Sequence, residues 1–171
     1  LIESKSVFYR QSAEDFMVLE HEKFMEIALK EARLGEAEGN DPVGSVIVQN
    51  GEVIAIGRNK ARTDLDLTAH AETVALRNVG PLVGHMDLTG CTLYTTFEPC
   101  MMCAGAIAFS KVDTVVMGGN YNRHYGGYGD YSVEGALASI GYDHVKVIRG
   151  VFVEACEEMF WRARGARRGL K

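Results

Sequence analysis

The chain has 171 residues, which is long enough for one domain with a sizeable hydrophobic core, so we expect a single domain over residues 1–171. Its composition, 47% hydrophobic and 24% charged, is that of an ordinary globular protein. The net charge of −5 argues against an extended nucleic-acid surface, because such a surface needs many Lys and Arg side chains to neutralise phosphates. No apolar run is long enough to cross a membrane, so we expect no membrane partner.

The ends of the chain and its cysteines bear on where the protein works. The first fifteen residues contain no apolar segment behind a basic stretch, so we expect no signal peptide. We expect a cytoplasmic, reducing location, where the close pair Cys100 and Cys103 favours metal binding or catalysis over a disulfide. The basic tail WRARGARRGLK, residues 161–171, is either solvated or a contact site for an anionic partner such as RNA.

The first half of the chain predicts a helix, a hairpin and a second helix. Ser12 starts a cap-like SAED, and apolar residues at helical spacing follow it up to the glycines before DPVG. SVIVQNGEVIAIG contains two β-branched runs around Asn50-Gly51, which predicts a β-hairpin. Residues 59–68 are expected to be irregular, and HAETVALRNV is expected to form a helix that ends before Pro81.

The second half alternates strands with helices. CTLYTT, DTVVMG and HVKVIRGV predict strands, whereas CMMCAGAIAFS, SVEGALASIG and EACEEMFWRAR predict helices. Residues 119–131, GNYNRHYGGYGDY, form a loop rich in Gly and Tyr without periodicity. This alternation predicts an α/β fold in which helices cover both faces of a mixed sheet, with the hairpin as its antiparallel pair.

Two motifs carry the candidate chemistry. His70 precedes Glu72 by two residues in TAHAETVAL, and Cys100 and Cys103 stand behind Pro99 in EPCMMCAGA. Taken separately, the histidine could be a helix cap, and the cysteines could be a redox pair, half of a structural zinc site or a coincidence. Taken together, one imidazole and two thiolates with an open fourth position are the ligand set of a catalytic zinc site.

Glu72 is the candidate proton carrier beside this site. It need not coordinate the metal, so its carboxylate can reach a water bound to zinc. Zinc lowers the pKa of that water from about 15.7 to about 7. A neighbouring carboxylate can take the proton and deliver it to the ring and to the leaving group. The layout suits hydrolytic loss of an amino group from an aromatic amidine carbon.

His-x-Glu followed by Pro-Cys-x-x-Cys is the signature of zinc nucleobase deaminases. The chain resembles the cytidine deaminase-like superfamily, most specifically from DPVGSVIV through TLYTTFEPCMMCAGAIAFSKVDTVVMGG. It looks most like the branch of tRNA adenosine, bacterial guanine and fungal-type cytosine deaminases. The resemblance implies a three-layer α-β-α sandwich with a central five-stranded mixed sheet. It also implies one Zn²⁺ per subunit, with a bound water or hydroxide, and a homodimer.

The resemblance also implies roles for individual residues. It makes His70, Cys100 and Cys103 the zinc ligands and Glu72 the proton shuttle. Asn59 matches an Asn that hydrogen-bonds the base, with a plain turn residue as the alternative.

Two further positions are implied with less direct roles. Val43 matches a position that lines the pocket in the tRNA enzymes, with core packing as the alternative. The backbone N–H groups near Ala71 and Cys100 would lie close to the bound water and the base.

The sequence of the Gly/Tyr-rich loop does not decide between the possible substrates. Where the tRNA enzymes have an acidic residue and a Lys-Thr-Gly cluster, this chain has Tyr121 and no such cluster. Asn120 is the first residue of an Asn-x-Asn motif that is similar to one in the cytosine deaminases. In those enzymes an aromatic residue follows the motif, whereas this chain has Arg123. The closing VEACEEMFWRARGARR instead resembles the tRNA enzymes. The loop tyrosines either stack on a small planar substrate or pack against a partner subunit: Tyr121, Tyr125, Tyr128 and Tyr131.

We therefore expect a small heterocyclic substrate. The expected enzyme removes an exocyclic amino group, as ammonia, from a free nucleobase or nucleoside of the cytosine, guanine or adenine type. The alternative is a tRNA-specific adenosine deaminase that converts adenosine to inosine. The alternative from another class is a catalytically silent deaminase-fold subunit. Such proteins often lose the glutamate or a ligand, whereas this chain keeps Glu72 and all three ligand residues.

Overall fold

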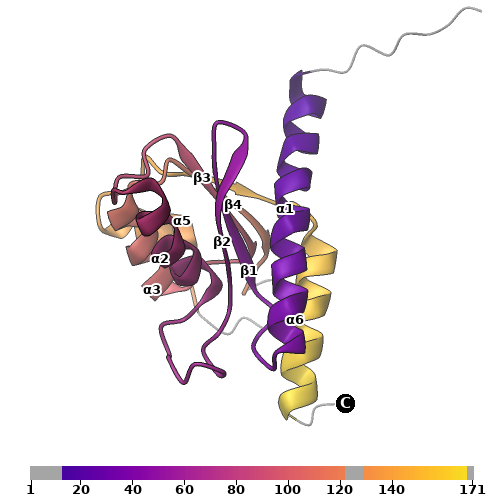
Figure 1. Cartoon of the computed structure of the whole chain (residues 1–171). Helices are drawn as coiled ribbons and strands as arrows, with labels where there is room; N and C mark the ends of the chain where they lie inside the picture. Colours follow the sequence, from indigo (N-terminus) through magenta and orange to yellow (C-terminus); the bar gives the residue numbers. More distant parts are fainter. Residues whose placement is uncertain (1–12, 122–128, 169–171) are drawn as a thin grey trace, which may run out of the picture.

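The computed structural model describes residues 13–121 and 129–168, and its helices and strands follow each other in the predicted order. They are α1 (Ala13–Ala37), β1 (Gly44–Gln49), β2 (Glu52–Arg58), α2 (Ala71–Val83), β3 (Cys91–Phe97), α3 (Met101–Ser110), β4 (Thr114–Gly119), α5 (Val133–Ser139), β5 (Lys146–Arg149) and α6 (Val153–Arg168). Figure 1 shows α1 and α6 against one face of the sheet and α2, α3 and α5 against the other. The predicted three-layer α-β-α sandwich is therefore confirmed.

The sheet is five-stranded and mixed, with the strand order β2-β1-β3-β4-β5. β1 runs antiparallel to both β2 and β3, whereas β3, β4 and β5 run parallel to one another. Asn50 and Gly51 join β1 to β2 with positive φ values of 52° and 77°, as a tight two-residue hairpin turn requires. Because β3 and β4 are parallel, their carboxyl ends meet at one edge of the sheet, next to Cys100 and Tyr121.

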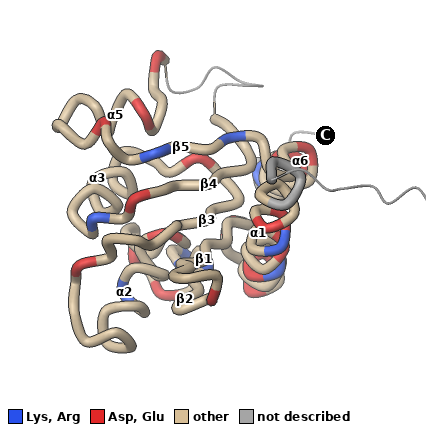
Figure 2. The backbone as a smooth tube through the Cα atoms, turned by 90° about the horizontal axis from the view of Figure 1, so that it is seen from above, with Lys and Arg blue, Asp and Glu red and all other residues tan. Residues whose placement is uncertain are grey.

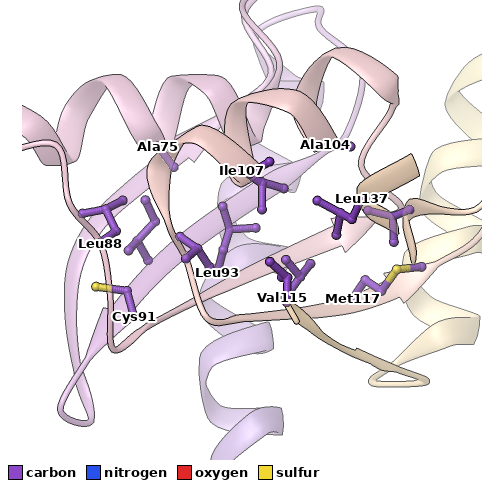
Figure 3. Close-up of a cluster of buried hydrophobic side chains, with 14 of the residues drawn as sticks. Ala75, Leu88, Cys91, Leu93, Ala104, Ile107, Val115, Met117 and Leu137 are labelled. Atoms are coloured by element: carbon purple, nitrogen blue, oxygen red, sulfur yellow. The ribbon is translucent and has the colours of Figure 1, made fainter. Parts of the chain in front are cut away.

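A separate hydrophobic core fills each side of the sheet. On the side of α2, α3 and α5, Ile107 packs with Leu93 and Val115 of the central strands (Figure 3). On the other side, Phe24 and Ala28 are four residues apart in the 25-residue helix α1, so both lie on its buried face. Neither α1 nor any other helix in the described ranges has the length and apolar character needed to cross a lipid bilayer.

The first turn of α2 lies directly on β2. A Cβ atom at Gly57 would stand 2.4 Å from the carbonyl oxygen of Ala71 and 2.4 Å from the amide nitrogen of Ala75. No side chain fits in that space, so glycine permits the close approach. The contact fixes the start of α2, and with it His70 and Glu72, against the sheet.

The predicted end of α2 before Pro81 is wrong, because the helix continues to Val83. Pro81 lies in the last turn, where its missing N–H leaves only the carbonyl of Arg77 without a helical partner. This part of the helix is at the surface, as the 71% exposure of Leu82 shows, so water can satisfy that carbonyl. Gly84 caps the end of the helix. Its left-handed conformation (φ 74°) lets its N–H donate to the carbonyl of Gly80.

Candidate metal centre and active site

The ligand candidates sit at the starts of two helices. His70 is the N-cap residue of α2 and Cys100 is the N-cap residue of α3, and both have extended backbone conformations. Neither side chain caps its own helix, so the imidazole and the thiol are free to face each other. Cys103 lies one turn into α3 and is fully buried. Two helix N-termini therefore meet at the sheet edge, and their positive dipole ends favour thiolates.

The separations between the three ligand atoms fit a tetrahedral zinc ion. Sγ of Cys100 lies 3.6 Å from Sγ of Cys103, and Nδ1 of His70 lies 3.5 and 3.6 Å from those two sulfurs. With Zn–S about 2.3 Å and Zn–N about 2.0–2.1 Å, tetrahedral angles require about 3.8 Å between sulfurs and about 3.6 Å between sulfur and nitrogen. The donor set and its spacing thus match one metal ion with a fourth position open. Within the described ranges, these residues form the one group with such ligand geometry.

Hydrogen bonding and burial shift the pKa values of the two cysteine thiols in opposite directions. The hydrogen bond with Cys103, followed by that with His70, lowers the pKa of Cys100 to about 4. The same shared proton raises the pKa of Cys103, and burial adds to this effect. A divalent cation between the sulfurs would displace that proton and hold both groups as thiolates.

Glu72 lies beside the three ligand atoms without joining them. Its side chain is buried, and its Oε2 lies 3.5 Å from Sγ of Cys103. Its Oε1 accepts a 3.2 Å hydrogen bond from the hydroxyl of Thr95 on β3, which fixes the direction of the carboxylate. Burial raises the pKa of Glu72, so the carboxyl can hold a proton more readily than an exposed glutamate.

A cavity of about 230 Å³ opens over these residues. This volume lies below the roughly 300–1,000 Å³ of sites for drug-sized ligands, so it suits a single planar heterocycle. The lining residues are Asp41, Val43, Asn59, His70, Glu72, Phe97, Glu98, Cys100, Tyr121, Phe160 and Arg164.

The metal-site motifs and the cavity coincide with a match to a known family. Residues 19–119, more than half of the chain, match the cytidine and deoxycytidylate deaminase zinc-binding region. The chain belongs to this family. It is a zinc-binding deaminase, a hydrolase that acts on C–N bonds, and its resemblance to the cytidine deaminase-like superfamily is confirmed.

The chain is similar to deaminases that are named for two kinds of substrate. The tRNA-specific adenosine deaminase of Bacillus subtilis (strain 168) is 38% identical over 139 residues, which cover 81% of this chain and 84% of the relative. A solved structure from a study of A-to-I editing by tRNA:A34 deaminases has a TM-score of 0.71 and 35% identity, covering 80% of this chain and 98% of that one. The guanine deaminase structure from Bacillus subtilis has a TM-score of 0.56 and 35% identity, covering 72% and 71%.

Asn59 combines a structural contact with a place in the deaminase cavity. Its Oδ1 accepts a 3.1 Å hydrogen bond from the N–H of Ala61, the contact that the turn interpretation requires. Its own N–H donates to the carbonyl of Val43, which also lines the cavity and is 8% exposed. Because Oδ1 already accepts the N–H of Ala61, Nδ2 is the group of this side chain that is left to act as a donor.

Two predicted site residues do not line the cavity. Ala71 is fully buried, and its side chain packs in a cluster with Phe97 and Phe160. The role predicted for the backbone N–H near Ala71 stays a prediction. The N–H of Asn120 donates to Oε1 of Glu157 at 3.1 Å, and it is the next residue, Tyr121, that reaches the cavity. The loop positions Asn122, Arg123, Tyr125 and Tyr128 lie outside the described residues.

The structure adds cavity residues that the sequence did not indicate. Phe97 and Glu98 precede the Pro-Cys motif directly, so the end of β3 was the available signal for them. Phe160 and Arg164 are four residues apart on α6, where only the packing of α6 against β3 and β4 brings them to the site. The α6 helix also extends the expected closing helix to Arg168, so the basic tail is largely helical.

Replacing Cys103 by Ala should abolish stoichiometric zinc binding. The expected loss of affinity exceeds the roughly 10–100-fold that removal of an outer-shell partner costs, and the protein should unfold more easily. Metal analysis of the purified variants measures this directly. Cys91→Ala is the matched control, because Cys91 is equally buried but lies outside the site. Full zinc content in Cys103→Ala would remove Cys103 from the metal centre.

Proposed function

We propose that this chain is a tRNA adenosine deaminase that hydrolyses adenosine to inosine. The observation that carries the proposal is Arg164, which the basic end of α6 brings into the wall of the cavity. Its guanidinium lies 5.2 Å from the ring centroid of Phe160, so its position is fixed by stacking. A free neutral base offers no phosphate to such a cation, whereas a nucleotide within RNA does.

Positive charge is concentrated at the C-terminal end of the chain, and this local cluster supports an RNA substrate although the net charge is negative. Residues 161–171 carry five Lys or Arg and no Asp or Glu, although the whole chain has a net charge of −5. Phosphate contacts require a local cluster of cations rather than a basic protein. The expectation of a free nucleobase rested on overall acidity and on the altered Gly/Tyr loop. The relatives that act on tRNA favour the alternative instead.

In the proposed reaction, water replaces the amino group of the adenine ring and ammonia leaves. Zinc, when bound by His70, Cys100 and Cys103, supplies a Lewis acid that makes water nucleophilic near neutral pH. Glu72 would accept one proton of that water and pass it to the ring nitrogen. It would then carry the second proton, from the hydroxyl newly bonded to the ring carbon, to the departing amine. Thr95 holds the carboxylate of Glu72 in the direction that these transfers need.

The base is proposed to bind between polar and aromatic walls. Asn59 presents its Nδ2 group as a hydrogen-bond donor to a ring acceptor. Phe97 stacks on Phe160 at 3.8 Å between ring centroids, and Tyr121 packs edge-on against Phe97 at 4.8 Å. This aromatic group is rigid, and it excludes water from one side of the cavity.

Two copies of the chain are proposed to associate through α3. The exposed face of this helix carries Met101, Met102 and Phe109, which are 64%, 37% and 79% exposed. The sequence of α3, MMCAGAIAFS, contains no charged residue. Helix α1 carries many, as Figure 2 shows. A helix that is apolar on all sides is normally covered, and a second copy of the same face can cover it.

Sedimentation should therefore give about twice the 18.8 kDa mass of the chain. Phe109→Glu should shift the protein toward monomer, because it would bury a charge in the interface. Val18→Glu, on the exposed part of α1, is the matched control. A wild-type monomer at micromolar concentration would contradict this association.

The substrate proposal is tested by measuring inosine in tRNA alongside ammonia release from adenine, guanine, cytosine and their nucleosides. We expect kcat/KM for tRNA to exceed that for any free base or nucleoside by about a hundredfold or more, because the polynucleotide adds binding energy outside the cavity. Arg164→Gln should reduce the salt dependence of tRNA binding by about one unit of log–log slope. Turnover of guanine or cytosine without inosine in tRNA would overturn the proposal.

Glu72→Gln should lower kcat by about 10²–10⁴-fold or more while zinc content stays at one per chain, because a proton carrier is lost but no ligand is. Glu31→Gln is the matched control, since Glu31 is also buried but pairs with Arg58 on the α1 side. Loss of zinc in Glu72→Gln, or retained turnover, would contradict the role assigned to Glu72.

A further inference from the structure

Glu98 is a buried carboxylate that the proposed reaction does not use. It stands between Phe97, the last residue of β3, and Pro99, which precedes the ligand Cys100. Its side chain is only 1% exposed. A buried carboxylate is unfavourable unless charged or polar partners surround it, so its partners show what it holds together.

The two oxygens of Glu98 accept hydrogen bonds from different elements. Oε2 accepts the backbone N–H of Tyr121, which follows β4, at 3.4 Å. Oε1 accepts the backbone N–H of Val133, the first residue of α5, at 3.1 Å. One carboxylate therefore joins the end of β4 to the start of α5.

Arg149 supplies the charge that balances this carboxylate. From the end of β5, its Nη2 lies 2.8 Å from Oε1 of Glu98, and its Nε donates to Oε1 of Glu134 at 2.6 Å. The guanidinium thus spans a buried carboxylate and a more exposed one on α5. Such a fork needs the planar geometry of arginine, which a lysine ammonium lacks.

The backbone around Glu98 is tied to the same two segments. The N–H of Glu98 donates to the carbonyl of Gly119 at 2.9 Å, and the hydroxyl of Tyr131 donates to the carbonyl of Pro99. These bonds connect the turn that carries Cys100 with the end of β4 and with the chain just before α5. The turn and the cavity wall are therefore one hydrogen-bonded unit.

Tyr121 is the part of this unit that faces a substrate. It lines the cavity together with Glu98, and its ring packs on Phe97 and Phe160. The side-chain packing fixes the tilt of the ring, whereas the bond to Glu98 fixes its backbone relative to Cys100.

We propose that Glu98, balanced by Arg149, is a positioning residue that sets the distance between the Tyr121 wall and the metal-ligand turn. The inference rests on the proposed function, in that a planar base occupies the space between them. Because Glu98 touches none of the reacting atoms, its loss affects ground state and transition state alike. The expected signature is a higher KM with little change in kcat.

The test compares Glu98→Gln with the wild type in three measurements: zinc content, amide hydrogen exchange and steady-state kinetics. The glutamine keeps the shape but replaces one acceptor by an N–H₂ group. Because Arg149 donates to Oε1, the glutamine oxygen should keep that place and the N–H₂ group should face the amide of Tyr121. That amide should therefore exchange at least about tenfold faster, whereas the amide of Val133 keeps its acceptor. KM should rise about tenfold while kcat stays within about twofold, and zinc should remain at one per chain.

Arg149→Lys is the second variant, chosen because it keeps the positive charge and leaves the carboxylate of Glu98 in place. Lysine cannot contact Glu98 and Glu134 in the forked geometry of the guanidinium, so KM should also rise, but by less than in Glu98→Gln. Glu134→Gln is the matched control, since it removes the exposed partner of Arg149 and leaves the bond to Glu98 in place. We expect its KM and the exchange of the Tyr121 amide to stay near wild-type values.

An unchanged KM in both Glu98→Gln and Arg149→Lys, or a loss of kcat together with zinc, would overturn the positioning role. Hydrogen exchange needs no substrate, and KM is measured on whichever compound the wild type deaminates. A wild type that deaminates guanine but not tRNA would overturn the proposed function. It would leave this inference open to the same KM test.

Discussion

The head-to-head meeting of two helix N-termini at one edge of the sheet is the constraint on which the rest of this protein depends. It brings His70 from α2 and the Cys100–Cys103 pair from α3 within 3.6 Å of each other. The meeting is possible because α2 packs on β2 at Gly57 and because α3 starts where β3 ends. The sandwich thus serves to hold three ligand atoms at tetrahedral spacing.

The parallel pairing of β3 with β4 gives the second level of organisation. It places the ligand turn next to the segment that follows β4, and Glu98 bonds the two together. The α6 helix then closes the cavity from the other face of the sheet with Phe160 and Arg164. The candidate metal ligands lie at the starts of α2 and α3. The cavity walls come from the ends of β3 and β4, from α6 and from the chain on either side of the β1–β2 hairpin.

Much of the fold and of the metal centre could be predicted, because both depend on local spacing. The hairpin followed from Asn50-Gly51, and the ligand set followed from two short motifs. The substrate walls could not be predicted in the same way. Phe160 and Arg164 reach the cavity only through tertiary packing, and the substrate role predicted for Asn120 stays a prediction, while its neighbour Tyr121 lines the site. The end of α2 was missed because solvent can satisfy a carbonyl that Pro81 leaves without a partner.

X-ray absorption at the zinc edge of the metal-loaded protein tests the central claim most directly. The account predicts two sulfur neighbours at about 2.3 Å, with nitrogen or oxygen neighbours at about 2.0–2.1 Å completing four-coordination. Three or four sulfur neighbours would mean that Cys91 or Cys156 has entered the site. An absence of sulfur, or a disulfide between Cys100 and Cys103 in the active protein, would contradict the account.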